Sequence, residues 1–319
     1  MKNIHYLPPA LLGDKSSLSD QARREIKNLS GAQPKAFLMQ ALGAWGVIFA
    51  TILLAIYIDT IWMTMLAVII IATRQNILGL LVHEQVHTLG FRGRYGDLVA
   101  NLLAAFPLGI TVASYAKVHL SHHKYFFTEK DPDHLRKSGK DWAFPMSYTH
   151  LAKILLSDVS GLSFIKLFKG KHLENTNVFK RLNPSPEYAR PIFYLLIATL
   201  LTYSGTWHIF LLYWVLPLVT VFPAIVRLGA ITEHVYNLPG ASVIASSPLI
   251  LIRWWEKLLL PNLNFTLHSY HHFFPGVAYC NLPKIHKIFQ QEKLINESNV
   301  FHGYMAYLKY LQSPQVVAK

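Results

Sequence analysis

The chain has 319 residues, of which 52% are hydrophobic and only 15% are charged, and 30 Lys and Arg against 17 Asp and Glu give a formal net charge of +13. Because a soluble domain usually carries about 25% charged residues, this composition argues against a purely soluble enzyme, and its apolar content excludes a disordered or fibrous chain. The single cysteine, Cys280, excludes a disulfide framework and any Cys-ligated zinc or iron–sulfur site.

Two long apolar blocks predict two helical hairpins that cross a membrane. The first block runs from about 36 to 82, and its opening 23 residues carry no charge, which is enough to cross about 30 Å of hydrocarbon. A polar break at Asp59 and Thr60 separates its two helices. The second block runs from 191 to 226 and turns near Gly205. Each hairpin therefore contributes two of four predicted crossings.

The distribution of charge predicts the orientation. Neither tight turn, 57–61 or 204–208, contains Lys or Arg, whereas both ends of the chain and the segment 92–190 are rich in them. We therefore expect the turns to face outward, and the termini, the large loops and the active site to lie in the cytoplasm. A third apolar stretch, 98–116, would separate the basic segments if it crossed, so we expect it to be re-entrant or buried against the bundle.

The remaining segments predict a cytoplasmic cap. Residues 142–172 alternate aromatic and aliphatic residues with Lys, which is typical of helices that lie on a membrane surface. The first seventeen residues have no apolar segment behind their charges, so we expect no cleavable signal peptide. We predict an all-α integral membrane protein with four transmembrane helices and a cytoplasmic helical cap. It would form one domain, 1–319, with cytoplasmic tails at 1–35 and 291–319.

Three histidine-rich motifs lie on the predicted cytoplasmic face. His83 and His87 are four residues apart, so on a helix their imidazoles point the same way, about 6 Å apart along the axis. Two further motifs each have one His followed three and four places later by a pair, which presents three imidazoles over about 100° of a helix, enough to serve two metal ions. Buried unpaired His would cost desolvation free energy, so metal ligation is the simplest shared explanation. The two motifs contain His119, His122 and His123, and His268, His271 and His272.

These motifs together resemble the three histidine boxes of the membrane fatty acid desaturase superfamily. They read HEQVH at 83–87, HLSHHKYFFTEKDPD at 119–133 and HSYHHFFPGVAYCNLPKIH at 268–286, and RLGAITEH at 227–234 resembles the additional Glu-His element of that family. The likeness covers about 40–290. It implies four helices with a cytoplasmic cap and a nonhaem di-iron centre. The implied ligands are His83, His87, His119, His122, His123, His234, His268, His271 and His272.

The resemblance implies an oxidoreductase. Removing hydrogen from an unactivated methylene needs an oxidant that no side chain supplies, and imidazole ligands suit iron. We predict an O2-dependent desaturase of a fatty acyl-lipid or acyl-thioester, with two Fe ions as cofactors and O2 as co-substrate. The chain has no His-Pro-Gly-Gly signature of a fused cytochrome b5 domain, so a separate ferredoxin or cytochrome b5-type protein would supply electrons at the basic face. The other expected partners are the lipid or fatty acyl substrate and membrane lipids, and no nucleic acid.

Four carboxylates near the boxes are candidates for fixing imidazole tautomers, namely Glu84, Glu233, Asp131 and Asp133. For Asp131 and Asp133, helix capping or surface solvation explains the sequence equally well. Seven further histidines lie outside the boxes, and we expect them to be exposed or interfacial. They are His5, His134, His150, His172, His208, His286 and His302.

Three other functions are compatible with parts of the pattern. The same architecture is associated with hydroxylases and ketolases of lipids, alkanes or carotenoids, because substrate placement decides whether a second hydrogen leaves or oxygen rebounds. HEQVH alone is also the motif of a membrane zinc metalloprotease, with His83 and His87 as ligands and Glu84 as general base. A haem protein would need facing histidines inside the bilayer, where the predicted spans hold only His208.

Overall fold

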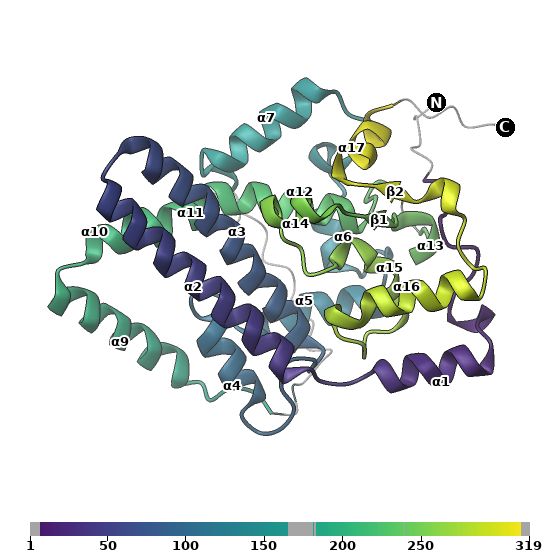
Figure 1. Cartoon of the computed structure of the whole chain (residues 1–319), viewed down its shortest axis with the longest axis horizontal. Helices are drawn as coiled ribbons and strands as arrows, with labels where there is room; N and C mark the ends of the chain where they lie inside the picture. Colours follow the sequence, from purple (N-terminus) through teal and green to yellow (C-terminus); the bar gives the residue numbers. More distant parts are fainter. Residues whose placement is uncertain (1–6, 165–180, 182, 239, 314–319) are drawn as a thin grey trace.

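The computed structural model describes residues 7–164, 181, 183–238 and 240–313, and these residues are mostly helical. Long apolar helices extend to one end of the molecule, and short helices gather at the other end (Figure 1). The helices of the elongated part are α2 (Pro34–Ile58), α3 (Ile61–Val86), α9 (Ala189–Ser204), α10 (Trp207–Phe210), α11 (Leu216–Val219) and α12 (Val221–Glu233).

The first hairpin, α2 and α3, forms as the sequence predicts. Asp59 adopts a left-handed conformation after α2, and the Thr60 side chain accepts a hydrogen bond from the backbone N–H of Met63 to cap α3. Small residues of α2, including Ala41 and Ala44, are buried in the core that α3 shares, so the two backbones approach closely. The opposite face of α2 exposes large apolar side chains, as a lipid-facing surface does.

The second hairpin is less regular. Gly205 turns the chain at φ 66°, where a side chain would be strained. Beyond it, α10, a π-helical turn at Leu211–Val215, α11 and α12 together run over Trp207–Glu233. By contrast α9 has 16 residues, about 24 Å at 1.5 Å per residue, and none of them is buried.

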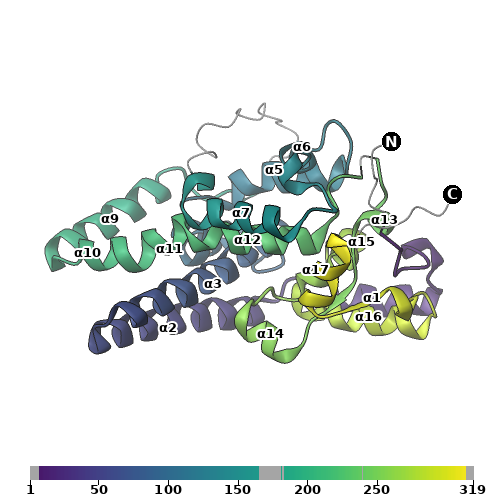
Figure 2. The ribbon, with the colours of Figure 1, turned by 90° about the horizontal axis from the view of Figure 1, so that it is seen from above.

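Three helices among the described residues are long and apolar enough to cross a membrane. They have 25, 26 and 27 residues, at Pro34–Ile58, Ile61–Val86 and Trp207–Glu233. The fourth predicted crossing falls on α9, which is shorter, so that crossing stays a prediction. The turn between α2 and α3 and the turn between α9 and α10 lie at the same end of the molecule, away from the short helices (Figures 1 and 2).

The apolar stretch at 98–116 packs inside the helical core. It forms α4 (Gly96–Ala100), a π-helical turn at Asn101–Ala105 and the start of α5 (Val112–Lys124). Ala100, Ala104 and Val112 are fully buried in the same core as α2 and α3. This packing agrees with the expectation of a segment buried against the bundle.

The cap combines short helices with one pair of short parallel strands, β1 and β2. Helix α1 packs on α16 through Ile26 and Phe289, and α7 and α17 meet α12 through Ile154, Tyr307 and Ile231. Of the predicted surface segment 142–172, the part that forms α7 is described, and 165–172 lies outside the described residues. The cap elements are α1 (Asp20–Leu29), α6 (Pro132–Arg136), α7 (Tyr148–Val159), α13 (Val243–Ser246), β1 (Ile250–Leu251), α14 (Trp254–Leu259), α15 (His268–Phe273), α16 (Leu282–Gln291), β2 (Phe301–His302) and α17 (Tyr304–Gln312).

Candidate metal centre

All nine predicted histidines meet where the long helices enter the cap. The C-terminal end of α3, the last two turns of α5, the residue after α12 and the short helix α15 supply them. Eight of the nine form two groups of four, and within each group one nitrogen from every ring lies within 4.8 Å of the others. The first histidine group is His83, His87, His119 and His271, and the second histidine group is His122, His234, His268 and His272.

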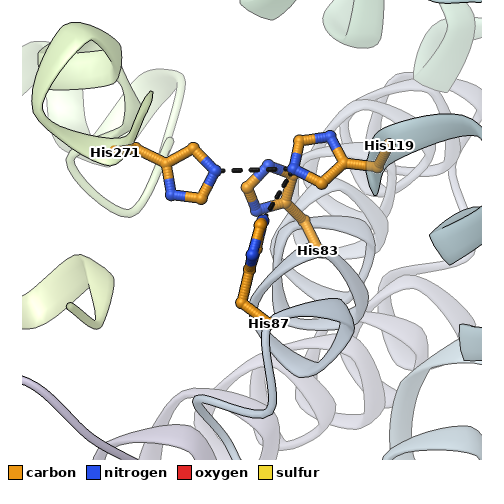
Figure 3. A group of neighbouring side chains, drawn as sticks. All are labelled: His83, His87, His119 and His271. Atoms are coloured by element: carbon orange, nitrogen blue, oxygen red, sulfur yellow. Dashed lines mark hydrogen bonds between the residues drawn. The ribbon is translucent and has the colours of Figure 1, made fainter. Parts of the chain in front are cut away.

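In the first histidine group, α3 and α5 present three imidazoles and α15 presents the fourth from the opposite side (Figure 3). The Nε2 atom of His119 lies 2.8 Å from Nε2 of His87 and 3.4 Å from Nε2 of His271. The ring of His83 is buried at 4% exposure, and neither of its nitrogens has a hydrogen-bond partner among the described residues. One nitrogen from each of the four rings therefore lies close enough to the others to share one ion.

The second histidine group is arranged around His234. Its Nε2 atom lies 3.3 Å from Nε2 of His122 and 3.1 Å from Nε2 of His272. The ring centroid of His268 is 4.7 Å from that of His234. The backbone of His234 is extended where α12 ends, which turns this ring toward α5 and α15.

His123 lies between the two groups. Its Nε2 atom is 3.0 Å from Nε2 of His119 and 3.1 Å from Nε2 of His271, both in the first group. Its ring also stacks on His272 of the second group, with centroids 4.3 Å apart. The structure therefore brings all nine histidines together, with His123 shared between the groups, and their role as ligands stays a prediction.

The donor set fits transition-metal ions. Two nitrogens that each lie about 2.1 Å from one ion are roughly 3.0–3.4 Å apart at angles near 90–109°, and most of the separations above fall in this range. Burial lowers the pKa of His87 to about 3 and holds the pKa values of His119, His271 and His272 well below the usual range. These rings are therefore neutral, which is the form that binds metal.

The four candidate carboxylates have four different surroundings. Asp131 accepts a hydrogen bond from Nδ1 of His122 at 2.8 Å and also accepts from two backbone N–H groups at the start of α6. It therefore both supports an imidazole and caps a helix, the two roles that the sequence leaves open. Asp133 pairs with Arg136 and Lys137 instead of a histidine. Glu84 accepts from the backbone N–H of Tyr279. Glu233 lines a cavity beside the histidines.

Three supports of the centre have no signal in the motifs. The Oγ atom of Ser247 lies 2.7 Å from Nδ1 of His234. Arg181 forms an ion pair with Asp97 and donates to the backbone carbonyls of Gln85 and Val86, next to the first box. Tyr115 stacks on His119, and its position four residues earlier on the same helix is the one signal that sequence analysis could have used.

Two histidines outside the boxes correct an expectation. His134 and His286 are buried, at 7% and 6% exposure, because His134 stacks on Phe127 and Nδ1 of His286 is hydrogen-bonded to the Tyr270 hydroxyl. His208 and His302 are exposed as expected. The His150 side chain is 44% exposed beside Asp141. His5 and His172 lie outside the described residues.

A cavity with an empty volume of about 330 Å³, its open mouth included, adjoins both histidine groups. His83 and His119 of the first group and His122 and His268 of the second group form part of its wall. The other lining residues are Tyr115, Val118, Asp133, Lys137 and Glu233.

A model of the fatty acid desaturase family matches residues 60–300, which include all nine histidines. This chain belongs to that family. It is also 26% identical over 248 residues to a dihydrorhizobitoxine desaturase of Bradyrhizobium elkanii, an alignment that covers 72% of this chain and 69% of that protein. The resemblance of the three boxes is thereby confirmed, and membership indicates an oxidoreductase associated with membranes, in keeping with the three long apolar helices.

The geometry of this desaturase-family site also bears on the metalloprotease alternative. A zincin needs the Glu of its motif to face the substrate cleft as general base. Here Glu84 is buried at 2% exposure and bonded to the backbone of Tyr279, and it does not line the cavity. His83 and His87 join two further histidines from α5 and α15. The first box is therefore one part of a larger donor set.

Proposed function

We propose that this protein is an O2-dependent desaturase that introduces a C=C bond into a lipid or fatty acyl chain, with a nonhaem di-iron centre held by the nine histidines. The observation that carries the proposal is the division of neutral imidazoles, six of them buried and two partly buried, into two groups of four that share a wall of one cavity. Iron accepts imidazole ligands readily, and two adjacent sites match the two-electron demand of the reaction.

The proposed reaction balances with reactants from outside the chain. A segment R–CH2–CH2–R′ and O2, together with two electrons and two protons, give R–CH=CH–R′ and two water molecules. The iron ions would supply the oxidising power that no side chain has. The contribution of the chain is to hold neutral rings in fixed orientation and to keep the reacting carbons beside them. Asp131 helps to hold the His122 ring in its orientation. An ionised carboxylate only accepts hydrogen bonds, so it fixes a proton on Nδ1 of His122.

The proposed topology has four crossings, with the termini and the histidine centre on the cytoplasmic side. Both turns between long helices lack Lys and Arg and lie at the end opposite the centre. The α9 helix of 16 residues, with Arg190 in its first turn, would cross where the bilayer thins locally, or with interfacial residues completing the span. Reporter fusions after Gly205 would test this topology, since an outward turn gives a periplasm-type signal and a cytoplasmic turn contradicts it.

The substrate need not be a fatty acid. The relative with 26% identity is named for dihydrorhizobitoxine, so desaturases similar to this chain are not all named for fatty acids. The reducing partner would be a separate ferredoxin or cytochrome b5-type protein. A hydroxylase or ketolase outcome differs only in whether oxygen stays in the product, and product analysis decides this directly.

Lipid and metabolite profiling of cells with and without the chain, combined with metal analysis of the purified protein, tests the proposal. We expect about two Fe per chain and a product two mass units lighter than its precursor. His122→Ala and His271→Ala, one from each group, should abolish the product and lower bound iron. His302→Ala replaces an exposed histidine and should change neither.

The alternatives give different results in the same experiment. A product sixteen mass units heavier than the precursor would identify a hydroxylase. About one zinc and no iron per chain would favour the metalloprotease. Full turnover of the His122→Ala and His271→Ala variants would refute the ligand assignment.

A further inference from the structure

The cavity beside the histidines has polar walls. Of its nine lining residues Val118 is the only aliphatic one, and three others, Asp133, Lys137 and Glu233, are charged at neutral pH in water. A bare methylene chain in this space would remove the Glu233 carboxylate and the exposed part of Lys137 from water without offering either a partner, which costs free energy. A wall of this kind suits a ligand with polar atoms.

Glu233 is the first of two groups whose bonding is incomplete. It is partly buried at the end of α12 and faces the cavity, yet its carboxylate forms no hydrogen bond or ion pair with any residue in the described part of the chain. Its neighbour Asp133, in contrast, is satisfied by Arg136 and Lys137. The carboxylate oxygens of Glu233 therefore keep acceptor positions open to water or to a ligand in the cavity.

Lys137 is the second incomplete group. Its ammonium donates to Asp133 at 2.7 Å and to the Tyr236 hydroxyl at 2.9 Å, and the ring of Tyr236 lies 4.6 Å away as a cation–π partner. An ammonium has three N–H donors, and two of them are used by these partners. The third has no acceptor among the residues that the structure describes, and the side chain is 17% exposed at the cavity.

We propose that this cavity binds a compact polar group of the substrate, which offers a hydrogen-bond donor such as an amine to Glu233 and an acceptor such as a carboxylate to Lys137. This inference rests on the proposed function and narrows its substrate class. The carbons that lose hydrogen then lie within a few bonds of this polar group, because His83, His119, His122 and His268 form another part of the same wall. The polar group belongs either to a small molecule or to a long-chain lipid with the same head.

Matched probes separate these cases. Calorimetric titration of the iron-loaded protein in lipid nanodiscs would compare norleucine with hexanoate, and 2-aminohexadecanoate with hexadecanoate, so that each pair differs only in the amine. We expect the amino compound of at least one pair to bind about ten- to a hundredfold more tightly, as a charge-assisted hydrogen bond predicts. Tighter binding of norleucine than of its long-chain counterpart would identify a small molecule, and the reverse order a lipid.

Three variants test the assigned contacts. Glu233→Gln should abolish the preference for the amino compound without weakening the binding of the plain acid, which has no amine for Glu233 to accept from. Lys137→Met should weaken binding of both acids about tenfold. Arg136→Gln is the matched control, because Arg136 pairs with the same Asp133 but is 44% exposed and does not line the cavity. Iron content is measured for each variant, since Glu233 precedes His234 in the chain.

The outcomes for the two proposals are distinguishable. Equal affinities within both probe pairs, or an unchanged amine preference in Glu233→Gln, would overturn the assignment of the cavity. If the unaltered protein still holds two Fe and forms a desaturated product, the proposed function stands even when the cavity assignment fails. Failure of the unaltered protein to bind iron would instead remove the proposed function, whatever the titrations give.

Discussion

In the second histidine group Asp131 and Ser247 hold Nδ1 of His122 and His234, and Nδ1 of His268 has no partner among the described residues. In the first group Nδ1 of His83 and Nδ1 of His271 both lack a partner there. The backbone explains this difference. His83 and His87 are fixed one turn apart on the long helix α3. Three members of the second group lie on an extended residue after α12 and on the six-residue helix α15, which also supplies His271 of the first group, and neither element fixes a ring by itself.

The comparison implies that the two groups keep their geometry by different means. The first relies on a rigid helix whose end is held by Arg181 through the carbonyls of Gln85 and Val86. The second relies on side chains that contact the rings directly. Variants that remove one kind of support should therefore affect one group more than the other, and iron content per chain distinguishes them.

The largest expected effect concerns a property that both groups share, the lowered pKa values of their histidines. It is an effect on the stability of the metal-free protein. Burial lowers the pKa values of His87, His119, His234, His268 and His271 in the folded protein, whereas in the unfolded chain a His titrates near 6.5. Below about pH 6.5 the unfolded chain takes up protons that the folded protein does not, so the free energy of unfolding decreases as pH falls and is independent of these groups above that pH.

Each such group changes the free energy of unfolding by up to about 1.4 kcal/mol per pH unit, so several together make acid unfolding steep. Thermal melts of the metal-free protein at pH 8, 6.5 and 5 should give similar Tm values at the first two and a marked drop at the third. Bound metal should move this drop to lower pH, because protons and metal compete for the same nitrogens. A metal-free Tm that is equal at pH 8 and pH 5 would contradict neutral, buried rings.

The second prediction removes a support of the second group. Asp131→Ala deletes the acceptor of His122 Nδ1 and the cap of α6, and we expect a ten- to hundredfold lower iron affinity, as is typical for such partners. Iron per chain should fall from about two toward one. Asp131→Asn keeps an acceptor for the backbone N–H groups of α6, so it should retain the helix. It should lose most of the support that the carboxylate gives to the His122 ring. Two tightly bound Fe in Asp131→Ala would refute this role.

The third prediction concerns the support of the first group. Arg181→Met leaves the buried carboxylate of Asp97 with Gln85 as its remaining side-chain donor and frees two carbonyls at the end of α3. We expect a loss of about 1–3 kcal/mol in the free energy of unfolding, and an iron affinity reduced less than in Asp131→Ala. The double variant with Asp97→Asn should recover part of the stability, measured by denaturant unfolding in detergent. A double variant less stable than Arg181→Met would contradict the ion-pair explanation.

The sequence alone was sufficient for the parts that depend on local patterns. The apolar period and the break at Asp59 predicted α2 and α3, and the spacing of the boxes placed His119 and His122 on one helix. It also predicts four spans; the described residues contain three of sufficient length, and the fourth crossing, at the 16-residue helix α9, stays a prediction.

The contacts between distant segments were not predictable in this way. The contact of Ser247 with His234 and that of Arg181 with Asp97 each depend on how the chain folds back, and a single Ser or Arg in a loop carries no periodic signal. The buried His134 and His286 were missed for the same reason, since a partner such as Tyr270 is known only from the fold.

The smallest predicted effect separates the two supports of the second group. An Asp carboxylate only accepts, so Asp131 forces the proton of His122 onto Nδ1 and leaves Nε2 free for a metal. A Ser hydroxyl can donate or accept, so Ser247 orients His234 without fixing its tautomer. Ser247→Ala should therefore lower iron affinity by no more than about tenfold, the value of one neutral hydrogen bond. Ser269→Ala removes a buried hydroxyl that donates to the backbone carbonyl of Ser247 instead of bonding an imidazole, so it is the matched control. An effect of Ser247→Ala as large as that of Asp131→Ala would mean that ring orientation, and not the position of the proton, governs metal binding in this group.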